Sequence, residues 1–161
     1  MEAPKLIGLA GWLGVSFVAA TFGAFASIHA VDFYAALVKP DWAPPAALFG
    51  PVWTCLYLMM GIAAWLVWRE RGFRAAALPL ALFLGQLAAN ALWSWLFFVW
   101  KRGPLAFAEV LVLWVLIAAT IATFHKVRPL AAALLLPYLA WVSFASALTY
   151  AVWQRNPGLL R

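Results

Sequence analysis

The sequence predicts an all-α integral membrane protein, a bundle of five transmembrane helices with a long ordered loop between the first two. Three observations predict this fold. Of 161 residues, 68% are hydrophobic and only 10% are charged, and the mean hydropathy is +0.95, which lies far outside the usage of soluble domains. Five nearly uncharged runs each approach the roughly 20 residues that cross a bilayer. The runs are continuous, which favours helices that satisfy their own backbone hydrogen bonds.

The five runs form a single membrane domain over residues 1–161. They occupy residues 6–28, 51–68, 75–100, 103–124 and 129–153. Lys5 and the small residues near Ala26 make the first run similar to a secretory signal peptide, but the run exceeds the usual 7 to 15 apolar residues of such a segment. We therefore count it as a span. Lys and Arg divide almost evenly between the two ends, so the charge rule for topology fixes neither the orientation nor the membrane.

The first span carries small residues at Ala19, Gly23 and Ser27. Their spacing places them on one helix face, where they allow another helix to approach closely, within the chain or in a second copy. We therefore expect tight packing of this span, and the same ridge is compatible with a homodimer.

The connection over residues 29–50, named the lid here, is longer than ordinary loops, and loops longer than about 12 to 15 residues usually carry function. It contains aromatic residues and three prolines, among them Pro44 and Pro45. Residues 32–38 are predicted to form two helical turns, and the prolines then impose an extended path. The alternative is an interfacial hairpin that rests on lipid headgroups with no ligand beneath it.

The second, third and fifth spans each present an aromatic or polar face at helical spacing. Trp53 and Tyr57 share a face of the second span, Gln86, Asn90 and Trp93 of the third, and Trp141, Ala145 and Leu148 of the fifth. Amides at membrane depth rarely face lipid. Gln86 and Asn90 therefore either bridge neighbouring helices or line a cavity for a flat, mostly apolar ligand.

The usual catalytic constellations are absent from the sequence. The two histidines, His29 and His125, are expected at opposite membrane faces, and Cys55 is the one cysteine, so we predict no metal site and no cofactor. Glu109 in the fourth span is expected to form an ion pair with Lys101 or Arg102, or to reach the headgroups. The net charge of +6 lies mostly beside the spans, which suits membrane lipid and not nucleic acid.

Three stretches resemble the signature segments of the TspO/MBR family, the tryptophan-rich sensory proteins related to the mitochondrial translocator protein. They are FYAALVKPDWAPPAALFGPVWTCLY (33–57), QLAANALWSWLFF (86–98) and LPYLAWVSFASALTYAVWQRN (136–156). The resemblance implies a dimeric five-helix bundle that binds porphyrins such as protoporphyrin IX, sterols such as cholesterol, and isoquinoline or benzodiazepine ligands under the first loop. It implies these ligand-binding residues: Tyr34, Pro44, Pro45, Phe49, Trp53, Tyr57, Asn90, Trp93, Trp141, Phe144, Ala145 and Leu148.

The resemblance also implies hydrogen-bond donors to the ligand at Trp53 and Asn90. A loose sterol pattern falls on Leu148, Tyr150 and Arg155, while Thr149 stands where family members commonly have asparagine. The predicted function is a receptor or carrier for tetrapyrroles with a regulatory or transport role. The alternatives are a light-dependent porphyrin-degrading enzyme that uses Trp53 and Trp141, and a structural partner of a membrane complex.

Overall fold

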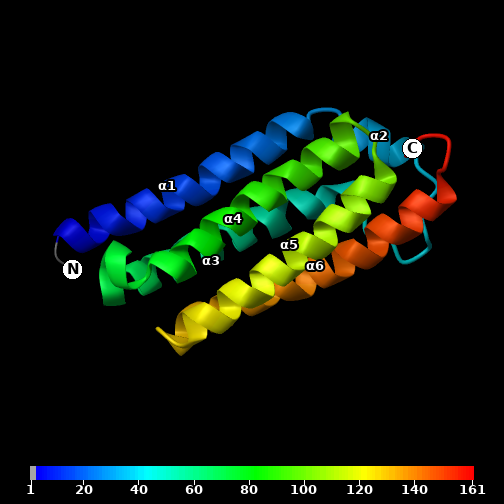
Figure 1. Cartoon of the computed structure of the whole chain (residues 1–161). Helices are drawn as coiled ribbons and strands as arrows, with labels where there is room; N and C mark the ends of the chain where they lie inside the picture. The colour runs from blue at the N-terminus through cyan, green and yellow to red at the C-terminus, as the bar shows by residue number, and fades with distance from the viewer. Residues whose placement is uncertain (1–2) are drawn as a thin grey trace.

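The computed structural model describes residues 3–161 as a bundle of long helices that run along one common axis (Figure 1). Five of its helices are long and apolar enough to cross a membrane, which confirms the predicted fold class. They are α1 (Ala3–Ala26), α3 (Phe49–Ala75), α4 (Ala77–Ser94), α5 (Gly103–His125) and α6 (Pro129–Arg155). A short π-helical segment, η2 (Trp95–Val99), continues α4.

The five long helices close into a ring. Helix α1 packs against α3 and α4, α3 packs against α6, and α5 packs between α4 and α6. The main core lies inside this ring and includes Met60, Phe83, Ile117 and Phe124, all of which are fully buried. Each helix therefore turns one face to the core and leaves apolar residues on its outer face, as helices in lipid do.

Helices α1 and α3 lie close together around Gly61. A Cβ atom built at this glycine would lie 3.0 Å from the backbone Cα of Leu13 and 2.7 Å from its Cδ2 atom. Any larger residue at position 61 would therefore push the two helices apart.

Helix α3 extends beyond the end that the sequence indicated. The link assigned to residues 69–74 is helical apart from a break at Gly72, where φ is 68° and ψ is −177°. Glycine adopts this positive φ without the steric cost that a Cβ atom brings. The helix therefore continues past Trp68, and the turn into α4 is reduced to Gly72 and the buried Ala76.

The lid folds into a short helix, an extended stretch and a turn. Helix α2 (Ala30–Ala36) begins two residues earlier than the helix predicted over 32–38, and the 3₁₀ turn η1 (Ala46–Leu48) leads into α3. The Lys39 Nζ atom donates hydrogen bonds to the carbonyl oxygens of Tyr34 (2.7 Å) and Leu37 (2.9 Å). Lys39 thereby adds a donor to the carbonyl groups at the end of α2, where the Tyr34 carbonyl oxygen also accepts from the Leu37 amide at 3.3 Å.

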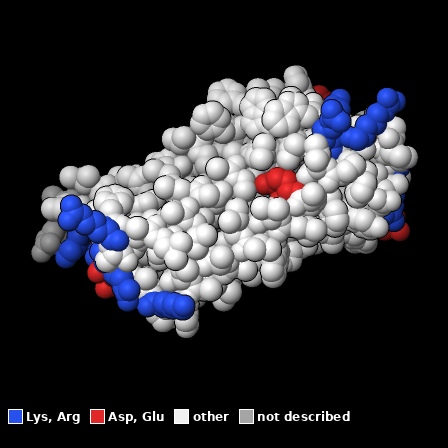
Figure 2. All heavy atoms as spheres, in the orientation of Figure 1, with Lys and Arg blue, Asp and Glu red and all other residues white. Residues whose placement is uncertain are grey.

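Charge is segregated to the two ends of the bundle. Figure 2 shows Lys and Arg gathered at both ends, with a broad band between them that holds one small acidic patch on the visible face. Arg128 and Glu70 form an ion pair at the end away from the lid. The chain is thus a multi-pass integral membrane protein, because its five long apolar helices and the band without Lys or Arg on the face visible in Figure 2 suit the hydrocarbon core.

Candidate functional site: an aromatic cavity beneath the lid

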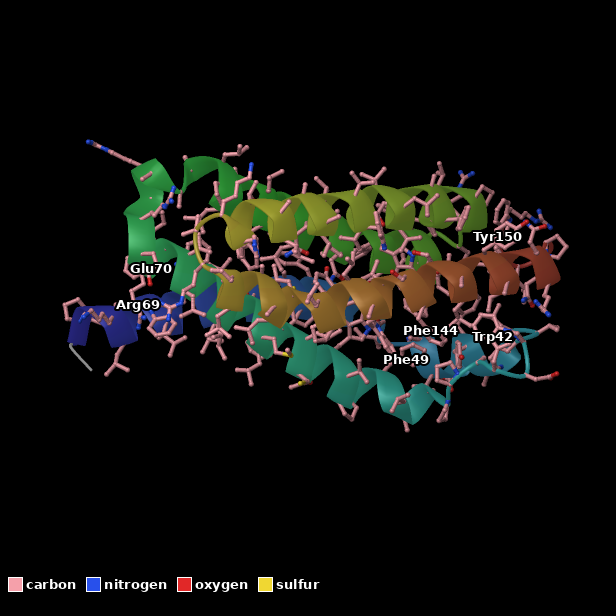
Figure 3. All side chains as sticks on the ribbon, turned by 90° about the horizontal axis from the view of Figure 1, so that it is seen from below. Trp42, Phe49, Arg69, Glu70, Phe144 and Tyr150 are labelled. Atoms are coloured by element: carbon pink, nitrogen blue, oxygen red, sulfur yellow. The ribbon has the colours of Figure 1, made fainter. Side chains whose placement is uncertain are left out.

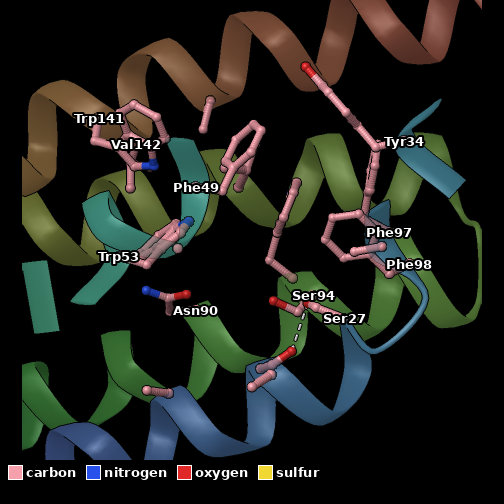
Figure 4. A pocket seen from close by; sticks show the side chains of 18 of the residues that line it. Ser27, Tyr34, Phe49, Trp53, Asn90, Ser94, Phe97, Phe98, Trp141 and Val142 are labelled. Atoms are coloured by element: carbon pink, nitrogen blue, oxygen red, sulfur yellow. Dashed lines mark hydrogen bonds between the residues drawn. The ribbon is translucent and has the colours of Figure 1, made fainter. Parts of the chain in front are cut away.

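A cavity of about 550 Å³ lies in the half of the bundle beneath the lid. This volume falls within the range of pockets that bind small molecules. Its walls come from α1, the lid, α3, α4, α5 and α6 (Figure 4). Most of the lining side chains are apolar or aromatic, so the cavity suits a ligand that is itself mostly apolar.

The structure brings most of the predicted ligand-binding residues together around this cavity. Nine of the twelve line it: Tyr34, Phe49, Trp53, Tyr57, Asn90, Trp93, Trp141, Ala145 and Leu148. Pro44, Pro45 and Phe144 do not line it. Thr149, which replaces the asparagine common in the family, lines the cavity and is buried.

The three residues outside the lining belong to the lid and its contact with α6. The Tyr34 hydroxyl donates a hydrogen bond to the Pro44 carbonyl oxygen at 2.9 Å. Burial raises the pKa of the Tyr34 hydroxyl. The Phe144 ring lies 5.7 Å from the Trp42 ring and 5.5 Å from the Trp141 ring. Phe144 therefore couples the lid to the cavity wall (Figure 3).

Aromatic rings from several elements line the cavity in contacting groups. The Phe49 ring meets Tyr34 edge-on at 5.5 Å and Trp141 edge-on at 5.9 Å. On the α4 side, the rings of Trp93 and Phe97 stack at 5.1 Å with an interplanar angle of 12°. Because these rings are held by one another, they offer flat surfaces with fixed orientation for stacking against a planar ligand.

A chain of neutral polar groups crosses the bundle beside the cavity. The Tyr57 hydroxyl donates to Asn90 Oδ1 at 3.3 Å, and Asn90 Nδ2 donates to the Tyr138 hydroxyl at 2.7 Å. The Tyr138 hydroxyl then donates to Gln86 Oε1 at 2.8 Å, and Gln86 Nε2 lies 3.7 Å from Met60 Sδ. These bonds tie α3, α4 and α6 together in an apolar interior, where unpaired polar groups are costly.

These hydrogen bonds decide between the two interpretations of the amides in α4. Gln86 only bridges helices, while Asn90 bridges helices and also lines the cavity. Sequence reasoning missed Tyr138 as part of the site. It lies three residues before Trp141, so its position on the same face of α6 was the available signal.

Two indole groups of the cavity wall have unused donors. The Nε1 atoms of Trp93 and Trp141 are buried and have no hydrogen-bond partner within residues 3–161. A buried donor without a partner costs about 1 to 3 kcal/mol. In Figure 4, Trp141 faces Trp53 and Asn90 across the cavity. The buried indole N–H groups of Trp93 and Trp141 are therefore free to donate to an acceptor, whereas Nδ2 of Asn90 already donates to Tyr138.

Helix α1 contributes a wall that sequence reasoning also missed. Phe17, Thr21, Gly23, Ala24 and Ser27 all line the cavity. Gly23 and Ser27 belong to the small-residue ridge, so part of that ridge makes room for the cavity as well as for helix packing.

The cavity also reaches the outer surface between α1 and α3. On α1, Thr21 and Ala24 are exposed although they line it, and Gly50 and Thr54 on α3 are exposed as well. The cavity is therefore open on the lipid-facing side of the bundle.

The lid is fastened to the end of α6 by one side chain. Asn156 Oδ1 accepts a hydrogen bond from the Val38 amide, and Asn156 Nδ2 donates to the Val38 carbonyl oxygen, both at 2.9 Å. The neighbouring Leu37 is 4% exposed and packs in the same apolar cluster as Leu160, which is 1% exposed. We call the pair of bonds between Asn156 and Val38 the lid clamp.

The residues of the sterol pattern do not share a surface. Leu148 lines the cavity, whereas Tyr150 is exposed and packs against the rings of Phe107 and Trp153. Arg155 is exposed at the end of α6, and its Nη1 atom donates to the Ala151 carbonyl oxygen. The sterol pattern therefore remains a prediction, with Leu148 on the cavity side and Tyr150 and Arg155 exposed.

The ion pair predicted for Glu109 is not formed. Both carboxyl oxygens of Glu109 are buried without a hydrogen-bond partner in the described part of the chain, and the residue does not line the cavity. The prediction was wrong because Lys101 and Arg102 lie in the turn before the start of α5, where Lys101 contacts Phe33 instead.

Comparison with known proteins identifies the family of this chain. Residues 12–154 match the TspO/MBR family. The chain is 44% identical to the translocator protein of Homo sapiens over 128 residues, which cover 78% of this chain and 76% of the relative. It is 39% identical to the tryptophan-rich protein TspO of Chlorobaculum tepidum over 149 residues, which cover 90% of each. The tryptophan-rich sensory protein of Cereibacter sphaeroides is 38% identical over 125 residues, 78% of this chain and 77% of the relative.

Proposed function

The chain belongs to the TspO/MBR family, and on that premise we propose that it is a membrane receptor or carrier that binds a tetrapyrrole such as protoporphyrin IX beneath its lid. The observation that carries this proposal is the aromatic cavity of about 550 Å³. A planar macrocycle offers the stacking surface that such a wall accepts. The names of the relatives, translocator and sensory protein, agree with a role in holding and releasing a small molecule.

The polar groups of the cavity fit a ligand that carries acceptors. Trp93 and Trp141 each have a buried indole N–H without a partner among the described residues. A carboxylate or carbonyl oxygen on the ligand would accept from these donors and remove the cost of leaving them unpaired. The propionate groups of a porphyrin supply such oxygens at the edge of a flat ring.

The structure offers binding surfaces and no acid–base pair at the cavity. Its polar lining consists of hydroxyl, amide and indole groups, and Glu109 lies outside it. General acid–base catalysis needs a titratable group placed at the reacting atoms. Light-driven electron transfer from Trp53 or Trp141 needs no such group, so it is the alternative that the experiment must separate from binding.

The test is quenching of tryptophan fluorescence by protoporphyrin IX in the dark, with purified protein in lipid nanodiscs. We expect saturable quenching that weakens about fivefold to tenfold in Trp141→Phe, because phenylalanine keeps the ring and removes the N–H donor, worth about 1 kcal/mol. The matched control is Trp100→Phe, since Trp100 is exposed and does not line the cavity. Equal affinities for all three proteins would refute binding at this cavity.

Illumination of the same complexes separates the two functions. A binding protein leaves the porphyrin absorbance bands fading no faster than free porphyrin fades. A light-dependent enzyme makes the bands fade faster, and the double variant Trp53→Phe with Trp141→Phe abolishes that loss while porphyrin still binds. Addition of cholesterol in the dark shows whether a sterol competes for the cavity.

A further inference from the structure

A second, smaller hollow lies outside the cavity at the lid end of the bundle. Its volume is about 330 Å³, and it is bordered by the end of α1, the start of α2 and the turn after η2. Phe98 lies between the two spaces, because it borders both. Two basic side chains, His29 and Lys101, stand at the rim of this hollow.

The ammonium group of Lys101 is held in place at this rim. Lys101 has a φ of 53° and is the one non-glycine residue with a positive φ within residues 3–161. A positive backbone φ is uncommon for a residue other than glycine. Its Nζ atom lies 4.9 Å from the centre of the Phe33 ring. That ring in turn meets the edges of Phe97 and Phe98 at 6.1 and 6.4 Å.

The three N–H donors of this ammonium group have no acceptor within residues 3–161. Lys101 forms no hydrogen bond and no ion pair with any described residue. Asp32 lies in the first turn of α2 and Arg102 lies beside Lys101, and among the described residues Asp32 forms no ion pair with either basic side chain. A positioned cation with free donors is a site for an anionic oxygen.

The surroundings of the hollow are apolar and face the lipid. Phe25 is 61% exposed, Ile28 is 67% exposed and Val99 is 43% exposed, and all three border it. The site lies at the membrane–water interface, because α1 ends at Ala26 and η2 ends at Val99 on the same side of the bundle. An acyl chain can pack on the three apolar residues while its headgroup stays level with the two basic ones.

We propose that this hollow binds one anionic phospholipid of the surrounding leaflet, with its phosphate on Lys101 and His29 and an acyl chain along Phe25, Ile28 and Val99. Charge complementarity selects an anionic lipid over a zwitterionic one, since basic residues at the interface attract anionic headgroups. The site is separate from the proposed porphyrin cavity and does not depend on it. An occupied hollow would brace α2, and with it the start of the lid, against the turn after η2.

Native mass spectrometry of the full chain, released from micelles with defined lipids, tests this proposal. The probes are phosphatidylglycerol and phosphatidylcholine of equal chain length. We expect one phosphatidylglycerol to be retained by the wild type and its apparent affinity to fall about fivefold in Lys101→Gln, the loss that one basic residue near the surface brings. Lys126→Gln, exposed at the opposite end, makes the same charge change and should behave as the wild type.

Three results would overturn the proposal. One is equal loss of lipid in Lys101→Gln and Lys126→Gln; another is equal retention of the two lipids by the wild type. The third is complete displacement of the lipid by millimolar inorganic phosphate, which would make the hollow a site for free anions. His29→Gln is a second variant that does not alter the turn at Lys101. It should lower the apparent affinity for phosphatidylglycerol about twofold. Unchanged retention in both His29→Gln and Lys101→Gln contradicts the assignment even if one variant folds poorly.

Discussion

The lid clamp can be removed by a single substitution, Asn156→Ala. In the structure this side chain joins the end of α6 to both backbone groups of Val38 at 2.9 Å. Its Nδ2 atom also donates to the Val152 carbonyl oxygen at 2.7 Å, within its own helix. Alanine cannot make any of these bonds. We therefore expect the lid to open more often while the five-helix bundle stays folded.

The expected size of the effect follows from the two bonds that cross to the lid. Each is worth about 1 kcal/mol net, so their loss costs about 2 kcal/mol. A difference of about 1.4 kcal/mol is a factor of ten in an equilibrium constant. The ratio of open to closed lid should therefore rise about 30-fold. The bond to Val152 is lost in both lid states and does not enter this ratio.

Hydrogen–deuterium exchange of the lid amides measures this ratio. Suitable probes are Ala43 and Leu48, whose amides bond to Pro40 and Pro45 within the lid and not to Asn156. Their exchange rates should rise about 30-fold in Asn156→Ala. Arg155→Ala is the matched control, because the Arg155 side chain is exposed and bonds only within α6. Equal lid exchange in the two variants would refute the idea that these bonds hold the lid.

Three further predictions concern the bundle. Tyr138→Phe leaves two buried amide atoms, Asn90 Nδ2 and Gln86 Oε1, without the Tyr138 hydroxyl and should lower the free energy of unfolding by about 2 to 3 kcal/mol. Tyr150→Phe, at an exposed tyrosine, should change it little in the same thermal melt. Gly61→Ala forces a Cβ atom to within 2.7 Å of an α1 side chain and should destabilise by about 1 to 3 kcal/mol; Gly85→Ala meets nothing within 4 Å and should stabilise by up to about 1 kcal/mol. Glu70→Gln removes a partly exposed ion pair, so the melting temperature in high and low salt should differ little from that of the wild type, with an effect below about 1 kcal/mol.

The helices and the position of the cavity could be predicted from the sequence because both depend on periodicity. Apolar runs of membrane length set the spans, and the spacing of Gln86, Asn90 and Trp93 placed polar and aromatic groups on one face. A long loop rich in aromatic residues and proline marked the lid. These signals are local, so they can be seen without knowing which helices touch.

The features of the site that could not be predicted from the sequence depend on contacts between distant segments. Small residues such as Gly23 look the same whether they serve helix packing or make room for a cavity, so the wall from α1 was not predicted. The partner of Tyr138 comes from α4, and the partner of Val38 comes from the end of α6. Glu109 was misjudged for the same reason, because nearness in sequence to Lys101 does not give nearness in space.

The lid clamp joins residues that are 118 positions apart in the chain. During synthesis the lid leaves the ribosome shortly after the first span, and its partner arrives only after the fifth. Until that moment the aromatic cavity has no fastened cover, whatever the state of the earlier helices. The lid can therefore be fastened only after the fifth span has been made. A chain arrested before Asn156 would hold any ligand beneath an unfastened lid.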